Sequence, residues 1–566
     1  MMPLLEKKRV NMSGLKIRCS ASLWHIGYWI SGLFLLLAQP VSVSANEILP
    51  AEIYQKGFVY CTAGNTNILN PQRVKAGVTI DAISTQVYDR LLDINPFTYR
   101  LMPSAAESWQ ISDAGRTFTF KLRRGIQFHQ TAWFTPTRAL NADDVVFSLQ
   151  RIFDPKSPYH RVGGGSYPYF DSLQLGSKIE SITKLNDDEV QIKLLRPDSS
   201  FLTHLATHFA VILSKEYADQ LLKEGKQEQI DRLPIGSGPF KLQEYRNGQY
   251  IRLARHDEYW KGRARIAQVV VDFASGGAGR MAKLITGECD VLPYPAANQI
   301  ALLRDDPKLK LSVQSGMNVS YLALNTQKTP LNNPTVRHAL SMLVNRDRLL
   351  KSIYYGTAEP ARALLPPVSW AFDHRLSEHY YTPVQAQKLL AEAGVSDLKL
   401  KLWVPTSAQS YNPSPLKMAE LIQADMAKAG VKVSIIPIDT QSFERGMLQN
   451  GDYDMVLTGW VSDSDDPDSF LRPQLGCSAI DSGSNYARWC EPRFDAFLHA
   501  ALTTDKLASR LLFYRNALQI MEQETPVIPI AHSLRLQGHR ADLHGLVLSP
   551  FGSTSFSEVY RQEPEQ

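Results

Sequence analysis

The stretch Thr117-Phe-Thr-Phe-Lys-Leu122 alternates polar and apolar side chains, and Asn141-Ala-Asp-Asp-Val-Val-Phe-Ser-Leu-Gln150 follows shortly after it. The first pattern has the two-residue period of a half-buried strand, and Gly115 before it marks a hairpin. The second pattern has an asparagine cap, early acidic residues and apolar helical spacing, so it predicts a helix. Strand and helix patterns therefore stand next to each other in this chain.

The same alternation continues along the rest of the sequence. Phe58–Cys61 is typical of a first strand, and a helix is predicted to begin after Asn333-Pro334. A further helix is predicted over Met418–Lys428, followed by a strand over Val431–Ile438. No internal repeat and no low-complexity tract interrupts the pattern. The sequence therefore predicts an α/β fold with mixed sheets.

Residues 1–45 have the features of an export signal. An apolar stretch over Leu23–Ala38 is followed by the small residues Val43-Ser44-Ala45, which suit signal-peptidase cleavage before Asn46. A membrane anchor is the alternative, but the apolar stretch is short for a helix that needs about 20 apolar residues. Cys19 precedes the apolar core, which argues against a lipoprotein. The basic residues of the leader are Lys7, Lys8, Arg9, Lys16 and Arg18.

Composition limits the classes of function. The whole chain has a formal charge of +5, but without its leader it keeps 56 basic and 55 acidic residues. Such near-neutrality, with no long basic run, does not indicate a nucleic-acid surface. With 44% hydrophobic residues, the mature chain is large enough for at least two lobes. No second apolar stretch is long enough to span a bilayer, so we expect a soluble exported product.

Four cysteines remain after cleavage. In an exported chain an even number favours disulfides, although the sequence alone permits three pairings. Cys477 and Cys490 enclose a short, turn-rich loop and form the preferred local pair, which leaves Cys61 and Cys289. Metal ligation is the alternative, but no C-x-x-C spacing is present.

Three long segments carry recognisable motifs. They are Ala106-Glu-Ser-Trp109 through Phe118-Thr-Phe-Lys-Leu-Arg-Arg-Gly125 to His129 and Ala142-Asp-Asp-Val145; Pro234-Ile-Gly-Ser-Gly-Pro-Phe240 with Arg255-His-Asp-Glu-Tyr-Trp-Lys-Gly262; and Asn333-Pro-Thr-Val-Arg-His-Ala-Leu340. Each alone has a plain structural interpretation. Together, and in this order, they resemble the periplasmic solute-binding proteins that serve oligopeptide and dipeptide ABC importers.

The resemblance is greatest to the dipeptide-binding branch of this family. It is carried by Gly57–Cys61, Gly287–Asp290 and Gly459–Asp468. Within that branch, the sequence resembles the binding proteins of Sap-type peptide-transport systems at Trp133–Thr137, Tyr169–Leu173 and Ala487–Cys490. The family implies the disulfides Cys61–Cys289 and Cys477–Cys490.

The resemblance also implies a two-lobed, periplasmic binding protein-like II fold with a ligand cleft between the lobes. We expect a first lobe over 46–316, which includes an extra subdomain at about 88–237. A second lobe over 317–530 and a return to the first lobe over 531–566 complete the expected organisation. Two crossing strands would act as a hinge, so that a ligand touching both lobes favours the closed state.

Asp463 is the main candidate for binding a ligand. In dipeptide-binding relatives an aspartate shortly after a Gly-Trp pair holds the peptide ammonium, and Asp463 stands there after Gly459-Trp460. A carboxylate in a dry cleft is costly unless it is paired, so it selects a cation. The structural alternative is an acidic turn shared with Asp465, Asp466 and Asp468. A calcium loop fails on spacing, because Asp468 and Gln474 stand where glycine and glutamate are needed.

Four further residues are expected near the ligand. Trp460 and Val461 are candidates for the pocket wall, and Gly77 is a candidate for close approach of ligand backbone, although it also fits a turn. Tyr411 stands near the family's carboxylate-binding position, but the preceding Ser407-Ala-Gln-Ser410 lacks the arginine found in dipeptide binders. Strict selection of dipeptides is therefore not expected, because that arginine fixes peptide length.

His204 and His208 lie four residues apart on a helix predicted over Ser200–Leu213. Such a pair can bind a metal ion or haem, but no third ligand stands at a helpful spacing. We therefore favour a structural role for both histidines and expect no metal and no cofactor.

An enzyme is disfavoured, since neither H-E-x-x-H nor G-x-S-x-G nor a phosphate loop is present, and no catalytic residue is expected. The resemblance implies instead a monomeric periplasmic receptor that captures peptides, including antimicrobial peptides, for the inner-membrane permease and ATPase subunits of a Sap-type importer. The alternative is a chaperone-like or sequestering binder of extended peptides or haem without transport.

Overall fold

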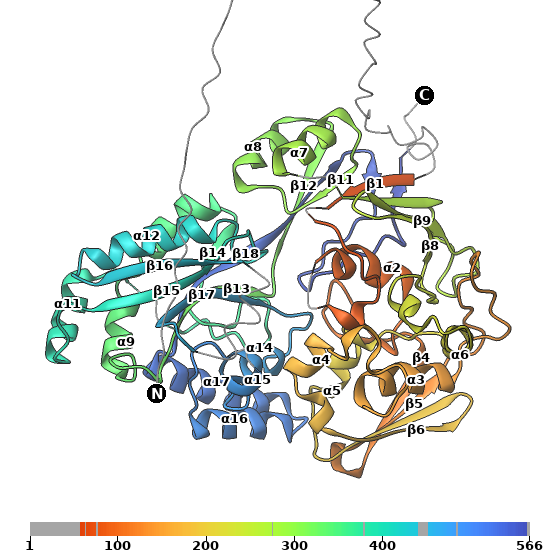
Figure 1. The fold of residues 1–566 in the computed structure, drawn as a ribbon, viewed down its shortest axis with the longest axis horizontal. Helices are drawn as coiled ribbons and strands as arrows, with labels where there is room; N and C mark the ends of the chain where they lie inside the picture. Colours follow the sequence, from red (N-terminus) through yellow and green to blue (C-terminus); the bar gives the residue numbers. More distant parts are fainter. Residues whose placement is uncertain are drawn as a thin grey trace, which may run out of the picture. The chain divides into compact units, whose positions relative to one another are not determined.

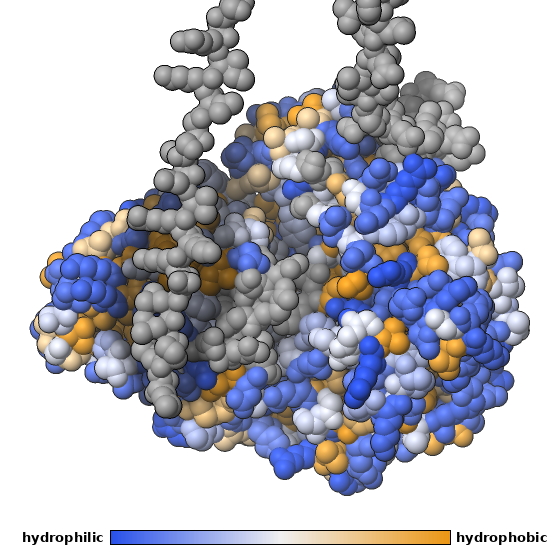
Figure 2. All heavy atoms as spheres, in the orientation of Figure 1, coloured by the Kyte–Doolittle hydropathy of each residue, from blue (hydrophilic) through white to orange (hydrophobic). Residues whose placement is uncertain are grey.

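The computed structural model describes residues 57–62, 64–74, 77–273, 276–376, 380–439, 451–482 and 485–562. The predicted export signal and the predicted mature N-terminus Asn46 lie outside these ranges. Within them, no helix is both long and apolar enough to cross a membrane. One face of the molecule carries mostly hydrophilic side chains, with apolar ones scattered between them (Figure 2).

A twelve-stranded sheet forms the centre of the described chain (Figure 1). Its spatial order is β16 (Lys432–Ile438), β15 (Lys399–Pro405), β17 (Met455–Val461), β13 (Asn318–Leu324), β18 (Val527–Arg540), β11 (Val291–Pro293), β1 (Gly57–Cys61), β10 (Gln268–Asp272), β9 (Tyr250–Arg255) and β8 (Phe240–Arg246). Two more strands, β12 (Leu309–Ser315) and β14 (Ala358–Pro360), also pair with β18.

The long strand β18 pairs with different neighbours along its length. Its first half is antiparallel to β13, where Ala323 lies opposite Val527. Its second half is antiparallel to β12, where Gln314 lies opposite Arg535, and to β11. The chain therefore passes between two groups of strands at β18 and again between β12 and β13.

Separate apolar cores belong to these two groups of strands. One core contains Phe58, Val271 and Phe556, and a second contains Leu322 and Ile528. A third core packs on the other side of β13 and β17, and no fully buried residue belongs to more than one core. We propose on this basis a first lobe of residues 57–316 with 531–562, and a second lobe of residues 317–530.

A smaller four-stranded sheet and several helices form the subdomain that we propose within the first lobe, over about residues 88–237. The strand order is β4 (Ala106–Ser112), β5 (Thr117–Leu122), β7 (Glu189–Leu194) and β6 (Ile179–Asn186). Its main helices are α3 (Ala142–Phe153), α4 (Pro168–Ser172), α5 (Phe201–Leu205) and α6 (Lys215–Glu224).

The remaining main helices cover the large sheet. In the first lobe they are η2 (Thr79–Ser84), α2 (Thr85–Val87), α7 (Gly277–Thr286) and α8 (Ile300–Asp305). In the second lobe they are α9 (Pro334–Ser341), α10 (Arg346–Leu349), α11 (Pro383–Glu392), α12 (Pro415–Ala427), α14 (Asp468–Leu475), α15 (Ala479–Ser482), α16 (Pro492–Leu502) and α17 (Leu507–Glu524). Two short ribbons complete the fold: β2 (Leu92–Ile94) with β3 (Leu101–Pro103), and β19 (Leu543–His544) with β20 (Tyr560–Arg561).

Local sequence signals explain where several elements begin. The predicted strand over 117–122 is β5, and its alternate side chains Phe118, Phe120 and Leu122 are buried. The predicted helix after Asn141 is α3, where Asn141 and Asp144 form reciprocal cap hydrogen bonds. Asn333 caps α9 in a similar way, by accepting a hydrogen bond from the backbone of Thr335. The mixed α/β class predicted from these patterns is confirmed.

Candidate functional site

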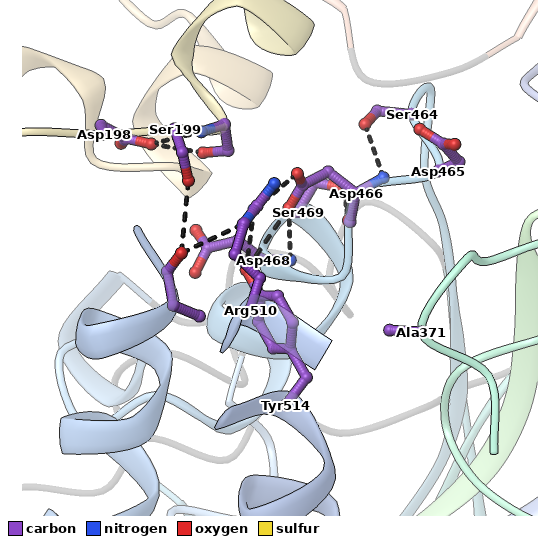
Figure 3. Close-up of polar contacts among 12 residues, drawn as sticks. Asp198, Ser199, Ala371, Ser464, Asp465, Asp466, Asp468, Ser469, Arg510 and Tyr514 are labelled. Atoms are coloured by element: carbon purple, nitrogen blue, oxygen red, sulfur yellow. Dashed lines mark hydrogen bonds and ion pairs between the residues drawn. The ribbon is translucent and has the colours of Figure 1, made fainter. Parts of the chain in front are cut away.

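An acidic turn connects the end of β17 to the start of α14. Ser464 Oγ accepts from the backbone N–H of Asp466, and Asp466 Oδ1 accepts from that of Asp468, at 3.0 Å in each case. These bonds direct the successive carboxylates of the turn toward different partners (Figure 3).

Two of the carboxylates are neutralised by arginines of the second lobe. Asp466 pairs with Arg510 of α17 at 2.8 Å, and both side chains are at least 90% buried. Asp468 accepts hydrogen bonds from Arg472, from Nε at 3.0 Å and from Nη2 at 2.6 Å. Figure 3 shows Arg510 lying between Asp466 and the α17 residue Tyr514. These pairs stabilise the turn within one lobe.

Asp465 directly precedes these paired acids, and none of the described arginines forms an ion pair with it. Burial and the neighbouring charge of Asp466 raise the pKa of Asp465 to about 7. Its carboxyl group therefore changes charge near neutral pH.

Asp463 pairs with a residue of the other lobe. Its carboxylate contacts Nδ1 of His208, which follows α5 in the subdomain of the first lobe. The second ring nitrogen, Nε2, lies 3.2 Å from the backbone oxygen of Val74. Both partners are acceptors, so both ring nitrogens must donate, and only the imidazolium form of histidine can do this. Asp463 is therefore already matched with a cation across the two lobes.

Other contacts also join the two lobes. The backbone N–H of Ser199 donates to the backbone oxygen of Leu502 at 2.9 Å, at the C-terminal end of α16. Ser478 Oγ donates to Gln174 Oε1 at 3.0 Å. The described structure thus holds the lobes in contact, with Asp463 at their junction.

The charge of Asp463 acts on two polar residues of the first lobe, Asp81 and Tyr294, and Arg535 lies beside them. Burial raises the pKa of Asp81 to about 6, since the lowering by the Arg535 charge offsets burial only in part and the Asp463 charge raises it further. Tyr294 connects the two, because its hydroxyl donates to Asp81 Oδ1 at 3.4 Å and accepts from Arg535 Nη2 at 3.0 Å. Sequence reasoning missed Asp81, Tyr294 and Arg535, which are brought together only by the fold.

Trp460 and Val461 lie on β17 just before the acidic turn. They stand opposite Val319 and Asn318 of β13, and both are partly exposed. The indole N–H of Trp460 donates to the backbone oxygen of Ser469 at 3.2 Å, which fixes the ring against the turn.

Tyr411 lies against β17 at Gly459. A Cβ atom at Gly459 would collide with the Tyr411 ring and with the Val319 oxygen, so glycine is needed for this close approach. The backbone oxygen of Tyr411 accepts hydrogen bonds from Tyr354 Oη at 2.9 Å and from Ser533 Oγ at 3.1 Å. Tyr411 therefore lies against β17 at Gly459, and the side chain of the next residue, Trp460, points to the opposite face of the strand.

Gly77 occupies an exposed turn with φ of +95°, and no heavy atom would lie within 4 Å of an added Cβ. Its oxygen accepts from the backbone N–H groups of Ile80 and Asp81, at 3.0 and 2.9 Å. A turn that starts η2 explains this glycine without a ligand.

The helix predicted over Ser200–Leu213 is wrong. The chain leaves helical geometry at Thr207, which has φ of −93° and ψ of 170°, so α5 ends at Leu205 before His208. Thr207 Oγ1 donates to the His204 oxygen at 2.8 Å and closes that end. His204 instead contacts Ser200 Oγ at 3.0 Å, so the two histidines have separate partners. Among the described residues no group of three or more His, Cys, Asp or Glu side chains is placed to hold a metal ion.

Both predicted disulfides are confirmed. Cys61 is joined to Cys289 with a Cα–Cα distance of 6.0 Å, and Cys477 is joined to Cys490 at 4.5 Å. The first connects β1 to the segment between α7 and β11, and the second closes the segment between α14 and α16.

Two lobes joined by crossing strands, with a charged residue at their junction, define the class of bilobed solute-binding proteins. A sequence profile of the bacterial extracellular solute-binding proteins, family 5 (middle region), matches residues 100–482. The chain belongs to this family. Family membership also answers the enzyme alternative, because these proteins bind solutes and do not convert them.

A named member of this family is similar to the chain over most of its length. The peptide transport periplasmic protein SapA of Salmonella typhimurium is 53% identical over 533 residues, which cover 94% of this chain and 97% of that protein. The predicted resemblance to Sap-type binding proteins and the predicted periplasmic location are confirmed.

Solved structures share the fold. A dipeptide-binding protein of Pseudoalteromonas in complex with Met-Leu is 40% identical, with a TM-score of 0.82 over 89% of this chain and all of that chain. DppA of Helicobacter pylori in complex with the peptide STSA is 30% identical, with a TM-score of 0.81 over 91% of this chain and all of that chain. The predicted periplasmic binding protein fold is confirmed.

Proposed function

We propose that this protein captures peptides in the periplasm and delivers them to the membrane subunits of a Sap-type ABC importer. The similarity to a named peptide-transport protein and to two peptide complexes supports this proposal. The observation that carries it is Asp463, an acid at the lobe junction that is paired with a cation from the opposite lobe.

The peptide ammonium would replace His208 as the partner of Asp463. The Asp463 side chain is 13% exposed, so losing one cation without gaining another would leave a mostly buried charge. An ammonium offers the same charge and hydrogen-bond donors as the imidazolium. This exchange would favour ligands with a free amino end.

Ligand binding would also control the contact between the lobes. β18 crosses from one lobe to the other, and a second crossing lies between β12 and β13. A peptide touching both lobes would stabilise their closed arrangement in proportion to its differential affinity. That arrangement is the state that an ABC permease would recognise.

Peptide length is not restricted by an arginine before Tyr411. The segment 407–410 contains only serine, alanine and glutamine, so it offers no bidentate partner for a dipeptide carboxylate. Trp460, Val461 and Tyr411 would form the wall along which the ligand lies, with Gly77 beside the turn that carries Asp81. Peptides longer than two residues, antimicrobial peptides among them, fit this proposal.

Calorimetry on the purified mature protein tests the function. We expect Met-Leu and Ser-Thr-Ser-Ala to bind with one peptide per protein, and N-acetyl-Met-Leu to bind at least about tenfold more weakly, since it lacks the charged amine. Equal affinity for Met-Leu and its acetylated form would contradict the role of Asp463. Failure to bind either free peptide would contradict peptide capture itself.

Uptake measurements separate transport from sequestration. Cells that carry the binding protein should import labelled peptide only when the ATPase subunit is also active. Uptake that is unchanged without the ATPase would favour a sequestering role.

A further inference from the structure

The guanidinium of Arg535 is a buried cation to which the described residues supply no ion-paired acid. Its residue is 7% exposed, and it lies on β18 where this strand passes between the lobes. No acidic side chain forms an ion pair with Arg535 within 4.0 Å among the described residues, although Arg472 and Arg510 each have one. Leaving a buried charge unpaired is costly, so such a charge commonly serves a partner.

Within the described part of the chain, only one of the three nitrogens of this guanidinium has a hydrogen-bond partner. Nη2 donates to the Tyr294 hydroxyl at 3.0 Å, whereas Nε and Nη1 are buried and have no acceptor among the described residues. Nη2 carries a second N–H, and this group together with the adjacent N–H of Nη1, or with that of Nε, matches the two oxygens of a carboxylate. The arrangement thus leaves a bidentate site for an anion.

Neighbouring groups hold the guanidinium in a fixed place. The carbon Cζ of Arg535 lies 5.5 Å from the centre of the Tyr294 ring, in a cation–π contact. Tyr294 has φ of 50°, which is uncommon for a residue with a side chain, and its N–H donates to the Leu536 oxygen at 3.0 Å. On the other side, a Cβ at Gly316 would lie 3.3 Å from Arg535 Cγ.

The surroundings of Arg535 also connect it to the proposed ammonium site. The Tyr294 hydroxyl contacts both Arg535 and Asp81, and the charges of Arg535 and Asp463 both act on Asp81. An acidic group, Asp463, and a basic group, Arg535, therefore both lie near Asp81 at the lobe junction. A peptide with a free amine and a free carboxylate carries the complementary pair of charges.

We infer that Arg535 binds a carboxylate of the peptide ligand through Nη2 together with Nε or Nη1, in place of the arginine that is missing before Tyr411. This inference rests on the proposed function and adds the substrate class, which is peptides with a free carboxylate as well as a free amine. The carboxylate can be the C-terminal one or that of an acidic side chain, since both offer the same two oxygens.

Calorimetry with matched ligands tests the inference without changing the protein. We expect Met-Leu amide to bind about tenfold to a hundredfold more weakly than Met-Leu, the range for hydrogen bonds to a charged group. Met-Glu amide distinguishes the source of the carboxylate, because it restores affinity only if a side-chain carboxylate is accepted. Equal affinity for Met-Leu, its amide and Met-Glu amide would overturn the inference while leaving peptide capture intact.

Substitution of Arg535 tests whether this residue binds the carboxylate. Arg535→Gln should reduce binding of Met-Leu to the level of Met-Leu amide and should leave the amide unaffected, so the two losses should not add. Arg535→Lys keeps the charge but loses the paired donors, so it should recover only part of the affinity. The control is Arg540→Gln, five residues further along β18, where Arg540 is 24% exposed and faces Asp542. If Arg535→Gln loses the same affinity for Met-Leu as for Met-Leu amide, the inference is overturned. If the wild-type protein binds no peptide at all, the proposed function is overturned as well.

Discussion

Asp463 and Asp466 belong to one short turn, but they are neutralised from opposite lobes. Asp466 faces Arg510 of its own lobe, and this pair is almost fully buried. Asp463 faces His208 of the first lobe, so its contact depends on how the two lobes meet. Two acids with nearly the same position in the sequence therefore have different tasks.

The difference lies in what happens when the lobes separate. The Asp466 pair would stay intact, because both residues move together with the second lobe. The Asp463 pair would break, and its carboxylate would become available to another cation. A charge paired within a lobe stabilises the fold, and a charge paired between lobes can report a ligand.

The largest expected effect is on the free energy of unfolding, which should depend on Asp466 much more than on Asp463. Asp466→Asn should lower the free energy of unfolding by about 3–5 kcal/mol, because it leaves Arg510 buried without its acid. Asp463→Asn should change stability by less than about 1 kcal/mol, since its lost partner lies at the lobe junction. Urea unfolding at pH 7 measures both. Equal destabilisation by the two variants would make Asp463 a structural residue.

A third acid of the same turn, Asp465, should make the stability of the protein depend on pH. Its folded-state pKa of about 7 lies above the usual value of 3.8, so folding favours its protonated form. This contribution to stability is complete below about pH 4 and is lost as the pH rises to about 7. Asp465→Asn should therefore gain stability relative to the wild type over this range, to about 2–4 kcal/mol above pH 7. Thermal unfolding from pH 4 to 8 checks this, and a constant difference would contradict it.

Binding measurements test the other side of the comparison. Asp463→Asn should weaken the binding of Met-Leu by about tenfold to a hundredfold, since the substitution removes a charge-assisted hydrogen bond to the ammonium. The binding of N-acetyl-Met-Leu should weaken by less than about threefold, because this ligand has no charged amine to pair with residue 463. Calorimetry on the two ligands gives both numbers. A similar loss for both ligands would show that Asp463 acts only on the shape of the site.

Much of the fold was predictable because its signals are local. Asn141 and Asn333 cap α3 and α9 through hydrogen bonds to residues that directly follow them. The short loop between Cys477 and Cys490 gave one disulfide preference directly. The helix over Ser200–Leu213 failed, because the apolar spacing continues past Thr207 while the backbone does not.

The site was predictable only in part, because its partners are distant in the sequence. Asp463 was found from the Gly-Trp pair before it, which is a local motif. His208 lies 255 residues away from Asp463, and Arg535 lies 241 residues away from Tyr294. No periodicity links such positions, so their contacts follow from the lobe arrangement and not from the pattern of residues.

The smallest expected effect concerns the cation that already occupies Asp463. His208→Ala removes this internal competitor, so free peptide amines should bind more tightly, by roughly threefold to tenfold, as the cost of displacing it disappears. N-acetyl-Met-Leu should gain little, because it does not compete for the carboxylate. His204→Ala is the matched control, since His204 contacts Ser200 within its own subdomain. Calorimetry with Met-Leu on the three proteins decides the point. Weaker binding of both ligands to His208→Ala would mean that His208 forms part of the surface that holds the peptide, and that the ammonium does not take its place.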